Sequence, residues 1–242
     1  MSAVEGSAML TSFINFCGQG APIASIGCYL APIPTIRDVT MTGTVGSLPL
    51  LPYSAMVSNA FMWTIYGVLK KEYALWSCNG VGCVLAAYYC LQFTSHIPKA
   101  KQTSILQAST PTLPGTVQQH AQAVAAVIGI TSLMAIFQPF ANTANLIGNV
   151  AVLFCILMFA SPLSVIRVVL QTKSAKSIPL PFTVLTCVNC FMWVIFGWFK
   201  LNDVNVYLPN ILGLTFGLIQ VALKVQFGDK DGLPMSTSGI AP

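Results

Sequence analysis

The sequence contains the stretch Asn59-Ala-Phe-Met-Trp63-Thr-Ile-Tyr66-Gly67, and this stretch returns as Asn189-Cys-Phe-Met-Trp193-Val-Ile-Phe196-Gly197. The two copies lie 130 positions apart, and six of their nine positions are identical. A duplication this specific predicts that one three-dimensional unit is used twice in the chain.

Further matches follow at the same spacing. Ala31-Pro32 falls on Ser161-Pro162, and Pro49 falls on Pro179. With one extra residue in the second copy, Asn79-Gly-Val-Gly82 falls on Asn210-Ile-Leu-Gly213. The chain is therefore predicted to be a tandem repeat, and the repeat decides the fold.

The composition indicates a membrane protein. Of the 242 residues, 55% are hydrophobic and only 7% are charged, whereas soluble domains carry roughly 25% charged residues. The net charge of +5 lies between the apolar runs, so it indicates membrane topology and not a nucleic-acid surface. Several runs contain no charged residue, and each is long enough for a span of about 20 residues. These runs are Gly6–Ile36, Val39–Leu69, Tyr73–Pro98, Gln102–Ile166, Ser177–Phe199 and Val204–Leu223.

Seven membrane-spanning helices are predicted, at 8–34, 47–69, 74–95, 118–138, 145–170, 179–200 and 204–226. Three crossings leave the chain on the far side of the membrane, so a second repeat running in the same direction needs one more crossing, which the bland helix at 118–138 supplies. The expected fold class is an all-α membrane protein with two parallel three-helix bundles joined by a linker helix, 3+1+3. The expected domains are the first repeat at 8–95, the linker at 96–144, the second repeat at 145–226 and a cytoplasmic tail at 227–242.

Orientation is predicted from the lysines and arginines in the loops. Eight of them fall on one side of the membrane and three on the other. This places the C-terminus in the cytoplasm and the N-terminus outside, in a multi-pass protein of the plasma membrane or an organelle membrane. The beginning of the chain has Glu5 and no Lys or Arg before its first apolar run, so we expect no cleaved signal peptide.

Paired polar and aromatic residues are the candidates for binding. An amide without hydrogen-bond partners costs several kcal/mol in hydrocarbon, so asparagines that recur in pairs within spans are expected to bind a partner or a ligand. Each helical Asn-x-x-x-Trp set places an amide and an indole on one face. A single such set is explained by interhelical hydrogen bonding and interfacial anchoring. Two symmetric sets predict a shared pocket for a neutral, hydroxyl-rich ligand, lined by Asn59, Trp63, Asn79, Asn189, Trp193 and Asn210.

Matched prolines interrupt the spans. Pro32 and Pro162 come late in their helices, and Pro179 comes early, matched by Pro49 or Pro52 in the first repeat. Proline removes a helix hydrogen bond and can kink the helix, so the symmetry favours hinges over simple helix ends.

The spans lack the residues of other functions. Charged side chains occur only near span ends, so we expect no ion coupling and no enzyme. Eight cysteines lie in or beside the spans, which argues against disulfides, and Cys187-Val-Asn-Cys190 has no further ligands nearby for a metal. We expect no metal and no cofactor.

At these residues the chain resembles the SWEET family of sugar transporters, part of the PQ-loop superfamily, over roughly Gly18 to Phe227. The most specific matches are Ser161-Pro-Leu-Ser164, Thr172-Lys-Ser174, Ile178-Pro179, Trp193-Val-Ile-Phe-Gly197 and Pro209-Asn210-Ile-Leu-Gly213. Parallel repeats of this kind are known from SWEETs. The resemblance implies a sugar held between the two bundles at mid-membrane and suggests homo-oligomers.

The resemblance also implies roles for single residues. Asn79 and Asn210 match the sugar-binding asparagines, and Trp63 and Trp193 match the residues that flank the sugar ring. Asn59 and Asn189 match positions that tune substrate size. The proline tetrad maps to Pro32, Pro162, Pro179 and Pro52, with Pro49 as a competitor for the last, and Tyr66 and Asp203 match the extracellular gate.

The main hypothesis is therefore a facilitative, bidirectional uniporter of mono- or disaccharides that works by alternating access in a lipid bilayer. One alternative is a PQ-loop transporter of amino acids or other small polar solutes. It is disfavoured because neither repeat contains a Pro-Gln dipeptide and no buried charge meets a zwitterion. The other alternative is a seven-helix receptor or scaffold, which does not require an internal duplication.

Overall fold

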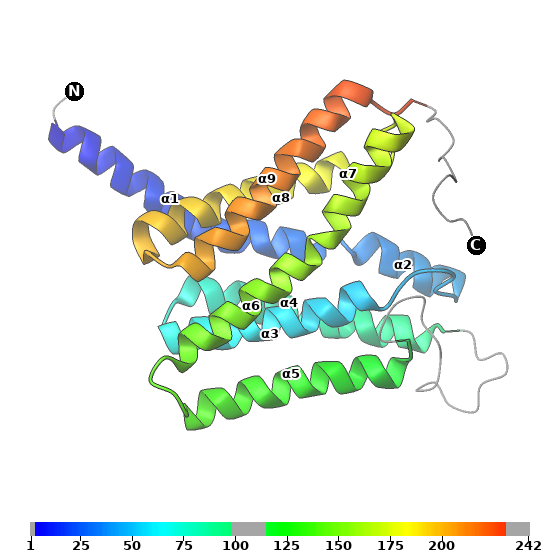
Figure 1. The fold of residues 1–242 in the computed structure, drawn as a ribbon, viewed down its shortest axis with the longest axis horizontal. Helices are drawn as coiled ribbons and strands as arrows, with labels where there is room; N and C mark the ends of the chain where they lie inside the picture. The colour runs from blue at the N-terminus through cyan, green and yellow to red at the C-terminus, as the bar shows by residue number, and fades with distance from the viewer. Residues whose placement is uncertain (1–2, 98–114, 231–242) are drawn as a thin grey trace. The chain divides into compact units, whose positions relative to one another are not determined.

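The computed structural model describes residues 3–97 and 115–230, and the elements in these ranges are helices (Figure 1). The predicted linker residues 98–114 and tail residues 231–242 lie outside the described part. In chain order the helices are α1 (Ala3–Leu30), α2 (Ile33–Thr42), α3 (Leu51–Lys70), α4 (Tyr73–Ser95), α5 (Val117–Phe137), α6 (Thr143–Met158), α7 (Ala160–Thr172), α8 (Leu180–Phe196) and α9 (Val204–Phe227), with a π-helical turn at Gly197–Leu201 before α9.

The structure confirms the all-α membrane class. Each of the seven predicted spans falls on helix. Large apolar side chains point outward, as Val84, Ile136 and Val225 show with exposed fractions of 71%, 71% and 83%. A surface of this kind is suited to lipid and not to water. Five helical stretches are long and apolar enough to cross a membrane: Tyr73–Ser95, Val117–Phe137, Thr143–Thr172, Leu180–Leu201 and Val204–Phe227.

The predicted span at 8–34 is broken into two helices, whereas the span at 145–170 forms one helical stretch in which only Phe159 separates α6 from α7. In the first, Pro32 has no N–H to donate to the carbonyl of Cys28, so α1 ends at Leu30 and α2 begins after the proline. In the second, Pro162 lies in the first turn of α7. Pro32 therefore follows the end of a helix, whereas Pro162 lies within a helical stretch that continues past Phe159.

The described contacts divide the chain into two compact units. The central unit is Ser25–Ala151, and the terminal unit is Met1–Ala24 with Val152–Pro242. Within the central unit α3 packs beside α4 and α5, and within the terminal unit α8 packs beside α9 (Figure 1). These units divide the chain at other places than the sequence repeats, whose bounds stay a prediction. The division falls inside α1. The first part of α1 packs on α8, where the ring centroids of Phe13 and Phe191 lie 6.4 Å apart.

Both repeats turn between their last two helices in the same way. At the end of α3, Lys71 adopts a left-handed conformation and the N–H of Glu72 donates to the carbonyl of Gly67 at 2.8 Å. At the matching place before α9, Asn202 is left-handed and the N–H of Asp203 donates to the carbonyl of Gly197 at 3.0 Å. The carbonyl of the identical glycine thus accepts the hydrogen bond that closes the helix end in both copies.

The extra residue of the second copy has a definite place. Gly67 and Gly197 are 130 positions apart, whereas Glu72 and Asp203 are 131 apart. The insertion therefore lies between the glycine and the acidic residue, where the structure has the π-helical turn Gly197–Leu201. A π turn holds one residue more than an α turn, so it absorbs the insertion without rotating α9.

The loops before α3 and α8 share two backbone features. Gly43 and Lys173 end the preceding helices in left-handed conformations. After them, the N–H of Leu48 donates to Val45 O at 3.0 Å, just as the N–H of Ile178 donates to Ala175 O at 3.0 Å. The two loops therefore share the helix end and this turn, and they differ at Gly46, which has a positive φ of 54° that the matching Lys176 does not share.

Candidate functional site

The two predicted sugar-binding asparagines are anchored in the same way on α4 and α9. Asn79 Nδ2 donates to the carbonyl of Leu75 at 2.8 Å, and Asn210 Nδ2 donates to the carbonyl of Val206 at 2.7 Å. Asn79 is buried, with 9% of its surface exposed, and Asn210 is half-buried. An amide has two N–H donors and two acceptor positions on its oxygen. The hydrogen bond to the helix therefore fixes each side chain, and each amide keeps further donor or acceptor positions.

The amide oxygens differ between the two repeats. Tyr29 Oη donates to Asn79 Oδ1 at 2.7 Å, so this oxygen already holds one hydrogen bond within the central unit. The residue 130 positions after Tyr29 is Phe159, which has no hydroxyl to donate to Asn210. The second asparagine therefore lacks the tyrosine hydroxyl that the first one has at the matching position.

Tyr29 is a candidate site residue that the sequence analysis missed. It lies one residue before the end of α1, where its own carbonyl accepts a hydrogen bond from Tyr89 Oη at 2.8 Å. Its ring packs over Gly82, because a Cβ built on that glycine comes within 2.4 Å of the ring. The signal was present in the repeat, since Tyr29 and Phe159 are matched aromatic residues, but sequence alone does not pair Tyr29 with Asn79.

The predicted tryptophans are buried next to a second aromatic ring. Trp63 lies edge-on to Tyr66, with ring centroids 5.5 Å apart. Trp193 lies 6.2 Å from Phe196, the matching residue in the other repeat. Asn59 and Asn189, one helical turn earlier, are both half-buried. The structure places each Asn-Trp set on one helix, the first in the central unit and the second in the terminal unit.

The predicted hinge prolines lie at the beginnings of helices. Pro32 and Pro179 are the N-cap residues of α2 and α8, Pro52 is the second residue of α3, and Pro162 is the third residue of α7. Pro49 lies in the loop before α3 at the position that corresponds to Pro179. A missing N–H is tolerated at such positions. Bending at these prolines stays a prediction.

The two predicted gate residues lie at the ends of α3 and α9. Tyr66 is fully buried, and the ammonium of Lys70 lies 5.5 Å from the centroid of its ring. Asp203 is the N-cap of α9, where its Oδ1 accepts a hydrogen bond from the N–H of Asn205 at 3.1 Å. Tyr66 belongs to the central unit and Asp203 to the terminal unit, and their pairing stays a prediction.

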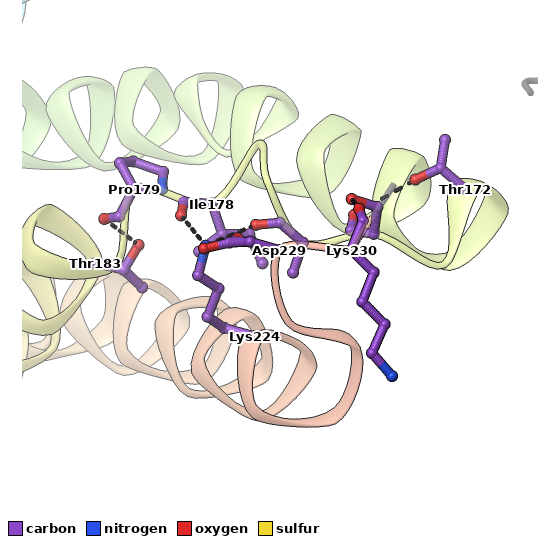
Figure 2. Close-up of polar contacts among 9 residues, drawn as sticks. Thr172, Ile178, Pro179, Thr183, Lys224, Asp229 and Lys230 are labelled. Atoms are coloured by element: carbon purple, nitrogen blue, oxygen red, sulfur yellow. Dashed lines mark hydrogen bonds and ion pairs between the residues drawn. The ribbon is translucent and has the colours of Figure 1, made fainter. Parts of the chain in front are cut away.

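The last turn of α9 is tied to the loop between α7 and α8 (Figure 2). Lys224 Nζ donates to the carbonyls of Ala175 at 3.0 Å and Ile178 at 3.2 Å. The same ammonium forms an ion pair with Asp229, which follows the helix. One partly buried cation therefore supplies donors to a loop whose carbonyls have no helical partner.

The backbone after α9 completes this contact. The N–H of Ala175 donates to Gly228 O at 2.8 Å, and Ser174 Oγ donates to Lys230 O at 2.6 Å. Figure 2 shows the ammonium of Lys224 pointing at the carbonyl of Ile178, whereas the side chain of Lys230 points away from the loop. The end of α9 therefore fixes the loop that comes directly before Pro179 and α8.

The two cysteines of the Cys187-Val-Asn-Cys190 stretch lie against α9. A Cβ built on Gly213 comes within 2.9 Å of Cys190 Sγ, and one built on Gly217 within 2.5 Å of Cys187 Sγ. Within the described residues all eight cysteines are free thiols, and no group of three His, Cys, Asp or Glu side chains is arranged to hold a metal ion.

Comparison with known proteins gives a consistent result. A family model described as "sugar efflux transporter for intercellular exchange" matches residues 15–101 and 145–231. The bidirectional sugar transporter SWEET14 of Arabidopsis thaliana is 30% identical over 208 residues, covering 85% of this chain and 70% of that protein. The sugar transporter SWEET1 of Dictyostelium discoideum is 27% identical, covering 90% of this chain and 94% of that protein. A solved structure of a eukaryotic SWEET transporter has the same fold, with a TM-score of 0.78 at 22% identity over 90% of this chain and 98% of that one.

Proposed function

Because the chain belongs to the SWEET family of sugar efflux transporters, we propose that it is a facilitative, bidirectional uniporter of mono- or disaccharides. The observation that carries the proposal is the family match over both repeats, residues 15–101 and 145–231. Two relatives that cover most of the chain are named as sugar transporters. The protein carries out no chemical reaction, so it is not an enzyme.

The sugar is bound by the symmetric polar and aromatic residues. Asn79 and Asn210 hydrogen-bond to sugar hydroxyls, with Asn210 as the stronger acceptor because Tyr29 already donates to Asn79. Trp63 and Trp193 contact the C–H faces of the ring. Asn59 and Asn189 tune the size of the substrate. Tyr66 and Asp203 form an extracellular gate. The helices bend during alternating access at four prolines, Pro32, Pro52, Pro162 and Pro179.

The protein resides in the plasma membrane with its N-terminus outside and its C-terminus in the cytoplasm. The excess of lysine and arginine in the loops on one side supports this orientation. The resemblance also supports assembly into homo-oligomers.

Uptake of radiolabelled glucose and sucrose into proteoliposomes without any ion gradient tests the proposal. We expect saturable uptake of at least one sugar, unchanged by proton and sodium ionophores, because the predicted membrane spans carry Asp, Glu, Lys or Arg only near their ends. Preloading with unlabelled sugar is expected to accelerate uptake, as alternating access requires. Uptake that needs a proton or sodium gradient would contradict uniport, and no flux in well-folded protein would favour the amino-acid transporter or the receptor.

Gly82→Ala is expected to lower sugar uptake severalfold. The new Cβ meets the ring of Tyr29 at 2.4 Å, so the ring must move and its hydroxyl leaves Asn79. Gly80→Ala is the matched control, because a Cβ there meets nothing within 4 Å and alanine favours the helix by about 1 kcal/mol. Equal uptake by the two variants at equal protein amounts would show that Tyr29 does not position Asn79.

A further inference from the structure

The terminal unit contains a cavity of about 190 Å³ between α7, α8 and α9. The residues of α9 that line it are Gly213, Phe216, Gly217 and Gln220, whose spacing places them on one face of the helix. Asn210 lies three residues before Gly213 and therefore on the same face. The face that presents the predicted sugar-binding amide thus continues into the cavity.

Gln220 crosses this cavity with a side-chain amide. Its Nε2 donates to the carbonyl of Pro162 on α7, and its Oε1 shares the hydroxyl proton of Thr183 on α8 with the carbonyl of Pro179, which lies closer to that hydroxyl at 3.2 Å. Both distances from the Gln220 amide are 3.4 Å, beyond the usual 2.7–3.2 Å of a good hydrogen bond. The amide therefore holds its neighbours weakly, and it keeps a second N–H and a second acceptor position for a ligand.

The remaining lining has the chemistry of a sugar site. Phe159 and Phe216 contribute aromatic rings whose centroids lie 5.4 Å apart, and Ser161 and Thr183 contribute hydroxyls. None of the lining residues is charged. An amide beside hydroxyls and aromatic rings suits a neutral, hydroxyl-rich ligand, and the small volume suits a single sugar ring.

We propose that this cavity is a second sugar-binding position, with Gln220 as its hydrogen-bonding group, through which the sugar passes on its way to or from Asn210. The proposal rests on the proposed function. Ten residues of helix separate Asn210 from Gln220, which is about 15 Å along the axis. The second position therefore lies toward the membrane face at which α9 ends and serves only sugar that enters or leaves there.

The test is to measure influx and efflux kinetics in cells, where all copies have one orientation, for wild type and Gln220→Met. Methionine keeps the length of the side chain and removes the amide. We expect the KM measured from the face at which α9 ends to rise about fivefold, as for the loss of one hydrogen bond. The KM from the opposite face is expected to stay within twofold. Thr215→Val, at an exposed position of α9, is the matched control and is expected to leave both KM values unchanged.

Thermodynamics supplies an internal check. A downhill carrier cannot shift the equilibrium of its solute, so Vmax/KM must remain equal in the two directions. The ratio of the two Vmax values is therefore expected to change by the same factor as the ratio of the two KM values. If Gln220→Met does not fold, Gln220→Asn replaces it, and its shorter amide is expected to cause a smaller rise on the same face.

Two results would overturn the inference while leaving sugar transport intact: unchanged KM values on both faces, or equal increases on both. The second is the result expected if Gln220 only braces α7 against α8. Wild-type protein that moves neither glucose nor sucrose would overturn the proposed function as well, and this outcome is recognised before any variant is measured.

Discussion

Asn210→Ala is expected to lower kcat/KM for sugar uptake by at least about tenfold, and Asn79→Ala is expected to have a larger effect and abolish saturable uptake. Each asparagine is held by its own helix, so its remaining donor and acceptor positions are already oriented for a sugar hydroxyl. Loss of two hydrogen bonds of about 1 kcal/mol each corresponds to a change of this size. Asn79→Ala also leaves the hydroxyl of Tyr29 without its acceptor at 2.7 Å, a cost that Asn210→Ala does not have.

The measurement is initial uptake of labelled glucose and sucrose into proteoliposomes with equal amounts of protein. Asn145→Ala is the matched control, because it makes the same change at an exposed position on α6. It is expected to transport like wild type. Wild-type uptake by Asn79→Ala and Asn210→Ala would show that the sugar is recognised elsewhere, although sugar transport itself would stand.

Gly67→Ala is expected to prevent stable folding of the protein. A Cβ built on Gly67 lies 2.6 Å from the backbone nitrogen of Trp76 and 2.8 Å from the Cβ of Leu75. Backbone cannot turn aside as a side chain does, so α3 and α4 must separate, at a cost of about 3 kcal/mol or more. The expected result is a large loss of monodisperse protein after detergent extraction, with a lowered melting temperature in what remains.

The second repeat provides a graded comparison. A Cβ on Gly197 meets the side chain of Val206 at 2.9 Å and the backbone nitrogen of Tyr207 only at 3.2 Å. Gly197→Ala is therefore expected to lose less monodisperse protein, with a smaller drop in melting temperature, than Gly67→Ala does. Gly80→Ala is expected to fold like wild type. A melting temperature of Gly67→Ala equal to that of Gly80→Ala would contradict the close approach of the two helices.

The repeat predicted much of the helical architecture but not the points where helices break. The spans at 8–34, with Pro22, Pro32 and Pro34, and at 145–170, with Pro162, were each expected to be one helix because neither is interrupted by charge before its last residues. The structure ends α1 at Leu30, because Pro32 cannot donate to the carbonyl four residues earlier. Hydropathy measures whether a segment prefers lipid, and it does not measure the hydrogen bonds within that segment.

The sequence predicted the asparagines of the candidate site but not the residues that form hydrogen bonds around them. Asn79 and Asn210 stand out in the sequence because buried amides recur at matched positions. Tyr29, Gln220 and Lys224 do not stand out, since their roles depend on contacts with residues 50, 58 and 49 positions away. Such long-range hydrogen bonds leave no local pattern in a single sequence.

The sequence by itself determined the membrane class, the duplication, the helix that joins the repeats and the paired amide and indole residues. These follow from composition, from periodicity and from the identity of two segments, which are all properties of residues near one another in the chain. Only the tertiary structure decided that the inserted residue becomes a π turn, that Tyr29 holds one of the two asparagines, and that α9 ties the loop before Pro179. The reason is physical: burial and local hydrogen bonding are encoded along the chain, whereas the asymmetry of the site arises where distant side chains meet.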